Sequence, residues 1–527
     1  MPFYSLILRN AVVFDGAGSA PKKSDIGVEG DRIAYIGDLS REKASEEVDA
    51  SGLYIAPGFI DITNHSDTHW ALFDSPLQEN MLYQGVTSIL GGNCGSSLAP
   101  LAKPSDIDDL QKWVDVSAIN INWQNTRELL EELANHRLAL NFGTLIGHGT
   151  LRRAAGIDIS RASGPEELGK ILYLLRNALE DGAFGVSTSL GRSHALSADN
   201  EEMGRIFTEV KAVNGLCAHH LQDEGADIVS AVSRIVSLTR DSGTRSHLSH
   251  FKVLGKKSWP KQNSALELVE RARSEGVKIT ADFFPYTSTG SNLYLLLPDW
   301  AIVGGRSKIF ERLSGDNSKK QVIEALKALT LHYEKIIVAS TLKDTGVAGK
   351  NIKQIAESAG LSPEEIILEL LISNDLQVII FNEAIDEENM LTLARKDYIA
   401  ISSDGYGLEL AGSGSKTNLP HPRSFGAFIR ALKVLVKEKG ILSWEEAIRK
   451  MTGLPAEIIG LEKRGLLREG FFADIVVFDP EAINDTADYI NPRRFSRGVR
   501  WVFVNGIAAL ADGKTAGKMP GRVLTRF

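Results

Sequence analysis

The sequence predicts an α/β protein with a (β/α)8 TIM-like barrel and a small β-sandwich domain built from both chain ends. Short apolar runs alternate with helical segments through the middle of the chain, and several runs end in Cys, His or Asp. Both ends instead carry short β-type runs separated by turn residues. The 527 residues exceed the roughly 250 that such a barrel needs, which leaves room for a second domain and an insertion.

The clearest repeating unit spans residues 215–252, where two short apolar runs end at His220 and His250. Apolar residues recur at helical spacing between them, and Gly243 supplies a helix stop. This pattern predicts strand, helix and strand, with both imidazoles at the carboxyl ends of neighbouring parallel strands. The carboxyl ends form the active-site face of such barrels. Two structural core histidines are the alternative interpretation of this pair.

The eight predicted barrel strands cover residues 59–65, 87–93, 139–148, 184–189, 215–220, 244–250, 278–286 and 398–404. The segment at about 287–397 is too long for one connecting helix, because most connections in compact domains are short. It is predicted to be an insertion over the active-site face, with helices and a strand of its own.

The two ends of the chain predict a separate small domain. Residues 3–55 contain short runs rich in Val, Ile and Tyr, punctuated by Asp-Gly and Gly-Asp. The far C-terminal part has the same texture, and Asn505-Gly506 is a strong hairpin signal. We expect these strands to pair into one domain from residues 1–56 and 453–527, with the barrel at residues 57–452 inserted between them.

The composition argues against several classes of protein. The net charge is −8, with 59 basic and 67 acidic residues spread along the chain, so neither nucleic acid nor an anionic membrane is an expected partner. No run of about 18 apolar residues occurs, and the N-terminus lacks the features of a signal peptide. With only Cys94 and Cys217, no disulfide framework is expected and a reducing cytoplasm is the predicted location. The sequence does not predict the oligomeric state.

Residue types that bind metals gather at five predicted strand ends, namely His65, Cys94, His220, His250 and Asp404. One thiolate and two imidazoles with an open fourth position describe a catalytic zinc site. An aspartate beside the bound water can take its proton and pass it to a leaving nitrogen. Each residue alone has a structural alternative, since a buried cysteine often acts as a small apolar residue and an aspartate often sits in a turn. The joint pattern favours a zinc site.

Eight motifs spread over nearly the whole chain carry a family resemblance. They are PGFID at 57–61, GVTSILGGNCGSSLAP at 85–100, HLQDEG at 220–225, SHFKVLGK at 249–256, DFFPYTSTGS at 282–291, SSDG at 402–405, HPRSFGAF at 421–428 and MTGLPAEIIGLEKRGLLREGFFADIVVFDP at 451–480. Together they resemble the amidohydrolase superfamily and, within it, the N-acyl-D-amino-acid deacylase (D-aminoacylase) family. GNCG and HPR-F-G-F are fairly specific to this branch, whereas PGFID and ADIVVFDP mark only the superfamily.

The resemblance implies a zinc-dependent hydrolase that splits the amide bond of N-acyl-D-amino acids into a carboxylate and a D-amino acid. By the same resemblance, Cys94, His220 and His250 would hold one tightly bound zinc ion. Asp404 would be the catalytic acid and base.

The resemblance also implies a binding site for the substrate carboxylate. Lys252, Tyr286 and Arg423 match positions that surround this group in the family. Their chemistry fits independently, because arginine and lysine pair with carboxylates and a tyrosine hydroxyl can donate a hydrogen bond. For Lys252 and Arg423 the alternative is a solvated surface charge.

One departure from the family pattern concerns a second metal. The family usually shows His-x-His at the end of the first strand, where this chain has Thr63-Asn64-His65. A hydroxyl is a poor zinc ligand beside imidazole, so a second, looser site is left with His65, a bridging Cys94 and the nearby Asp67. Two other functions stay open: a cyclic-amide hydrolase of the hydantoinase or dihydroorotase kind, and a non-catalytic binding protein with the same fold.

Overall fold

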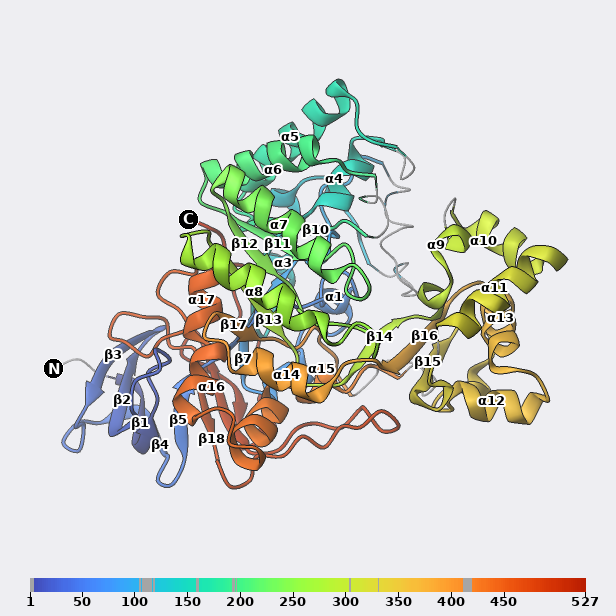
Figure 1. The fold of residues 1–527 in the computed structure, drawn as a ribbon. Helices are drawn as coiled ribbons and strands as arrows, with labels where there is room; N and C mark the ends of the chain where they lie inside the picture. The colour runs from blue at the N-terminus through green and yellow to red at the C-terminus, as the bar shows by residue number, and fades with distance from the viewer. Residues whose placement is uncertain are drawn as a thin grey trace.

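The computed structural model describes residues 4–103, 106, 116, 119–157, 161–191, 195, 197–302, 305–329, 331–410 and 419–527. A parallel α/β barrel occupies the centre, with a sheet made by both chain ends beside it and an insertion projecting from another side (Figure 1). Within these ranges no helix combines the length and the apolar character that crossing a bilayer demands.

The barrel strands form two parallel sheets that close on each other. They are β6 (Phe59–Asp61), β7 (Val86–Gly91), β8 (Asn141–Thr144), β9 (Ile146–Gly147), β10 (Gly185–Ser189), β11 (Leu216–His220), β12 (Arg245–Leu248), β13 (Ile279–Phe283) and β17 (Ile399–Ile401). One sheet orders β6, β7 and β8, and the other runs from β9 through β13 to β17. β8 leads into β9 after Leu145, and a parallel bridge between Asn64 and Gly405 joins the remaining edges. The predicted TIM-like barrel is confirmed, with its third predicted strand divided into β8 and β9.

Helices cover the outside of the barrel. They include α3 (Thr126–His136), α5 (Pro165–Glu180), α6 (Asn200–Ala212), α7 (Ile228–Ser242), α8 (Lys261–Ser274) and α14 (Glu387–Ala394). In α7 the buried residues include Ile228, Val232 and Ile235, so the apolar stripe packs inward. Gly243 ends this helix with φ of +66°, a left-handed conformation that glycine adopts at little cost. The predicted helix stop is confirmed.

Strands from both chain ends share one sheet. Its strands are β1 (Tyr4–Val13), β2 (Lys22–Glu29), β3 (Arg32–Gly37), β4 (Ala44–Asp49), β5 (Tyr54–Pro57), β18 (Ile475–Phe478), β19 (Val499–Val504), β20 (Ile507–Ala511) and β21 (Lys514–Thr515). The two ends meet where β18 pairs antiparallel with β5. β19 and β20 pair antiparallel across Asn505-Gly506, as the hairpin signal predicts. The small domain built from both ends is confirmed, and its exact boundaries at residues 56 and 453 stay a prediction.

The segment predicted as an insertion at about 287–397 has a hydrophobic core of its own between Leu293 and Ile380, whereas α14 near its end packs in the core of the barrel. It contains α9 (Asp299–Ile302), α10 (Gly305–Ser314), α11 (Asp316–Ala328), α12 (Ile352–Ala359), α13 (Pro363–Ser373), β14 (Ser288–Asn292), β15 (Ile336–Thr341) and β16 (Val378–Glu383). The three strands form an antiparallel sheet in the order β14-β16-β15, where the sequence predicted one strand. Its helices project away from the barrel (Figure 1), and β14 leaves the barrel a few residues after β13 ends.

Candidate metal and active site

The candidate site lies just beyond the carboxyl ends of the barrel strands. Cys94 follows the end of β7 by three residues, His250 follows β12 by two, and Asp404 follows β17 by three. All three have positive φ, at +53°, +40° and +46° respectively. Residues other than glycine rarely adopt this conformation, and it clusters at functional sites. The strands predicted to end at His250 and Asp404 therefore end earlier in the structure. His220, the remaining residue of the predicted site, is itself the last residue of β11.

Cys94, His220 and His250 converge, although they are far apart in the sequence. The Cys94 Sγ lies 3.1 Å from His250 Nε2, and His220 Nδ1 lies 3.0 Å from the same nitrogen. One donor atom from each of the three residues lies within 4.8 Å of the others, the one such group of three or more Cys, His, Asp or Glu residues in the described parts of the chain. Burial alone would raise the pKa of the Cys94 thiol, but His250 and the hydrogen bond from His220 hold it well below its usual value. A thiolate and two imidazoles fit a divalent zinc ion with one position left open.

Asp404 lies next to this cluster between two basic side chains. Its carboxylate is 2.7 Å from Arg423 Nη1 and 3.0 Å from His65 Nε2. Burial alone would raise its pKa, but Arg423 above all, followed by His250, holds the pKa well below its usual value. Asp404 is therefore ionised and able to accept a proton.

The contacts of Thr63 differ from those of a metal ligand. Its hydroxyl donates to the carboxylate of Asp282, which also accepts from the backbone N–H of His250. His65, the remaining candidate for a second site, lies 3.9 Å from the Cys94 Sγ and bonds to Asp404. Asp67 accepts from the backbone N–H of Gly92 at 2.6 Å. The residues present thus do not reproduce the histidine pair that a second metal would use.

Two of the three predicted carboxylate-binding residues lie over one ring. The Lys252 Nζ is 5.9 Å and the Arg423 guanidinium carbon 4.8 Å from the centroid of Phe284. Both are already paired with acids, Lys252 with Glu224 at 2.6 Å and Arg423 with Asp404. Lys252 is only 7% exposed, so the alternative of a solvated surface charge does not describe it.

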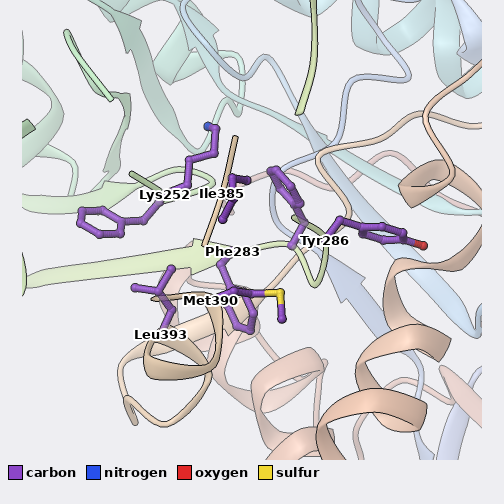
Figure 2. Close-up of a pocket in the computed structure, with 8 residues that line it drawn as sticks. Lys252, Phe283, Tyr286, Ile385, Met390 and Leu393 are labelled. Atoms are coloured by element: carbon purple, nitrogen blue, oxygen red, sulfur yellow. The ribbon is translucent and has the colours of Figure 1, made fainter. Parts of the chain in front are cut away.

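Tyr286 is less well placed for binding the same carboxylate. Its buried hydroxyl donates to the backbone carbonyl of Pro422 at 3.3 Å, directly before Arg423 in the chain. The Tyr286 hydroxyl and the Lys252 ammonium point in different directions (Figure 2). Tyr286 thus contacts the N-cap of helix α15 (Arg423–Arg430), which begins with Arg423, and direct contact with substrate stays a prediction.

Beneath Lys252 lies a small apolar cavity of about 10 Å³, room for a single water molecule. It is lined by Phe251, Lys252, Phe283, Phe284, Tyr286, Ile385, Met390 and Leu393. The alkyl stem of Lys252 packs along this wall while its ammonium group points away from it (Figure 2). The cavity is too small for a substrate, and its apolar wall limits where the ammonium group can go.

Two other histidines have structural contacts. His219 faces away from His220: it bonds to Thr188 at 2.8 Å and Ser246 at 3.2 Å, and burial lowers its pKa to about 3. His148 bonds to Glu202 at 2.5 Å and is fully buried.

Sequence reasoning missed two acids of the site, Glu224 and Asp282. Glu224 lies within the quoted motif HLQDEG, four residues after His220, and Asp282 opens DFFPYTSTGS. Nothing in either motif distinguishes a buried acid from one at a turn, since the partners of both come from other strands and loops.

Comparison with known proteins identifies relatives along the whole chain. A model described as the amidohydrolase family matches residues 46–291 and 416–507. D-aminoacylase of Alcaligenes xylosoxydans xylosoxydans is 31% identical, over 99% of this chain and 98% of that protein.

Two solved structures match the fold equally well. One is a D-aminoacylase, studied for its binuclear metal center with one-metal activation and second-metal attenuation; it has a TM-score of 0.83 and 29% identity over 99% of this chain and 100% of that one. The other is N-acyl-D-glutamate deacylase of Bordetella bronchiseptica with zinc and a phosphonate mimic of the tetrahedral intermediate. It has a TM-score of 0.83 and 27% identity over the same shares of the two chains.

Proposed function

The chain belongs to the amidohydrolase family and is a hydrolase of carbon–nitrogen bonds, and we propose that it uses zinc to release D-amino acids from N-acyl-D-amino acids. The observation that carries this proposal is the convergence of one thiolate and two imidazoles beside an ionised Asp404. The relatives named D-aminoacylase and N-acyl-D-glutamate deacylase support the substrate class.

The charges of the site support a substrate that carries a carboxylate. Lys252 and Arg423 both lie over Phe284. The carboxylate of an N-acyl amino acid can pair with these two cations, whereas an uncharged hydantoin offers no such group. This favours the open-chain substrate over the cyclic amide.

The chemistry divides between the metal and the side chains. When bound, zinc supplies Lewis acidity toward the amide carbonyl and lowers the pKa of a water molecule. Asp404 accepts a proton from the attacking water as the new C–O bond forms. The same residue then donates that proton to the amine nitrogen as the C–N bond breaks. The products are a carboxylate and a free amino acid.

The two cations would set the orientation of the substrate. Lys252 and Arg423, placed over Phe284, would bind the α-carboxylate and hold the adjacent amide toward Asp404. Holding the reacting groups in one geometry contributes to the rate and also selects one enantiomer. With the carboxylate and the amide both fixed, the opposite configuration at Cα would place its side chain where the hydrogen of the preferred enantiomer lies.

We further propose that one zinc ion suffices. Thr63 replaces a family histidine and is hydrogen-bonded to Asp282, so a second ion would lack a ligand. The relative described with one-metal activation and second-metal attenuation is consistent with activity at one metal per chain.

Two free cysteines and no disulfide fit a reducing, cytoplasmic location.

The test is a metal count joined to a substrate panel. Purified protein is analysed for zinc and assayed with matched N-acetyl-D- and N-acetyl-L-amino acids and with a hydantoin. We expect one zinc ion per chain and release of D-amino acids in preference to L. Hydantoin cleavage without deacylation would assign the chain to the cyclic-amide class, and two tightly bound zinc ions would refute the metal count.

A further inference from the structure

Glu224 lies behind both histidines of the candidate metal site. Its Oε1 is 3.2 Å from His250 Nδ1, and its Oε2 is 3.8 Å from His220 Nε2. On the other side of each ring, His250 Nε2 lies against the Cys94 Sγ, and His220 Nδ1 lies against that same His250 nitrogen. One buried carboxylate thus faces the far side of two metal-binding rings.

Glu224 is placed to accept a hydrogen bond from Nδ1 of His250. A metal on Nε2 leaves the proton of the neutral ring on Nδ1, where an acceptor is needed. Two groups lie near this nitrogen, the carboxylate of Glu224 and the ammonium of Lys252 at 3.0 Å. An ammonium group has donors only, so Glu224 is the one of the two that can accept the proton.

Glu224 also holds Lys252. Its Oε1 lies 2.6 Å from the Lys252 Nζ, and both side chains are less than 10% exposed. The ammonium group, with its stem against the apolar wall, therefore has its position set by the same oxygen that faces His250. The proposed metal ligand His250 and the proposed carboxylate-binding residue Lys252 therefore share Glu224 as their acidic partner.

We propose that Glu224 is a positioning residue that orients His250 for the metal and places Lys252 for the substrate carboxylate, while it faces His220 at a longer distance. The proposal rests on the function proposed above and adds a residue that acts through its neighbours. Carboxylates that accept a hydrogen bond from a metal-bound histidine raise the basicity of the ring and restrict its orientation. The loss of such a partner typically costs about 10- to 100-fold in metal affinity.

The experiment measures zinc dissociation constants by competition with a chromophoric chelator, on the full-length chain and without substrate. We expect E224A to weaken zinc binding about 10- to 100-fold. E224Q retains one acceptor oxygen and should fall between the wild type and E224A. K252M removes the ammonium group but leaves the carboxylate behind the rings, so its zinc affinity should not fall.

Glu202 provides a matched control, because its buried carboxylate likewise pairs with one histidine and one permanent cation, here His148 and Arg152. We expect E202Q to lower the melting temperature without changing the zinc dissociation constant. Wild-type zinc affinity in E224A would overturn the proposal, as would an equal loss in K252M, which would assign the effect to the ion pair. An E224A or E224Q chain that does not fold would make Glu224 a fold determinant and also overturn it. Failure of the wild type to bind zinc would instead refute the proposed function.

Discussion

Replacing Asp404 with asparagine tests the assignment of the proton carrier. The substitution removes the charge and the proton acceptor but nearly preserves the shape. The amide oxygen can still accept from Arg423 Nη1, which lies 2.7 Å from the native carboxylate, and the amide nitrogen faces His65 Nε2. The segment after β17 that carries position 404 should therefore keep its conformation, while proton transfer by this side chain is lost.

The expected loss follows from the size of general acid–base catalysis. A positioned acid or base contributes about 10²- to 10⁴-fold, which corresponds to about 3 to 5 kcal/mol of the activation barrier. We expect kcat of D404N to fall by that factor. Zinc content should be unchanged, because Asp404 lies outside the Cys94, His220 and His250 group.

The variant also has a stability cost. Arg423 and Asp404 have side chains only 12% and 9% exposed, so removal of the charge leaves a largely buried guanidinium without its ionic partner. Breaking a buried pair in this way costs on the order of 3 kcal/mol. Melting curves establish a working temperature at which both proteins remain folded.

The assay is the release of free amine from N-acetyl-D-amino acids at saturating substrate. E202Q is the matched control: it removes a buried carboxylate that also pairs with one arginine and one histidine, on helix α6 and outside the metal-binding group. We expect E202Q to lose stability and to keep kcat within about threefold of the wild type. A D404N enzyme with a wild-type kcat would refute the role assigned to Asp404.

Three further predictions test other parts of the site and the fold. Lys252→Met should raise KM for N-acyl amino acids about 10- to 100-fold, the factor that corresponds to the free energy of one hydrogen bond to a charged group. The KM of matching neutral amides should not change. Equal effects on both substrates would contradict the carboxylate-binding role. Thr63→His restores the histidine pair, so zinc titration should detect a second, weaker ion; a stoichiometry that stays at one would contradict the ligand argument. The His148 and Arg152 partners hold the pKa of Glu202 at about 2 despite burial. That depressed value stabilises the fold by about 3 kcal/mol above pH 4.5 and the contribution is lost as pH falls toward 2; unfolding titrations should show this acid-induced loss in the wild type and much less of it in E202Q.

Many elements of the barrel and of the terminal sheet could be predicted from local sequence patterns. The apolar runs that end at His220 and near His250 are strands, Gly243 ends the helix between them, and Asn505-Gly506 forms a hairpin. Each of these features depends on residues that are neighbours in the chain. Side-chain periodicity and turn chemistry were therefore enough to predict them.

The internal structure of the insertion was harder to predict from the sequence. Its length indicated an insertion, but its three strands include β14 and β16, which pair across about ninety residues of sequence. Such pairing depends on which apolar faces meet in the folded chain, and the propensity of each segment carries little information about that.

At the site, the residue types Cys94, His220, His250 and Asp404 were determined by the sequence alone. The tertiary structure decided what surrounds them: that Glu224 stands behind two imidazoles, that Thr63 donates to Asp282, and that Arg423 neutralises Asp404. The physical reason is that a motif specifies which donors and acceptors a chain carries. Their pairing, and hence their charge state, depends on distances of about 3 Å between side chains that come from different strands and loops.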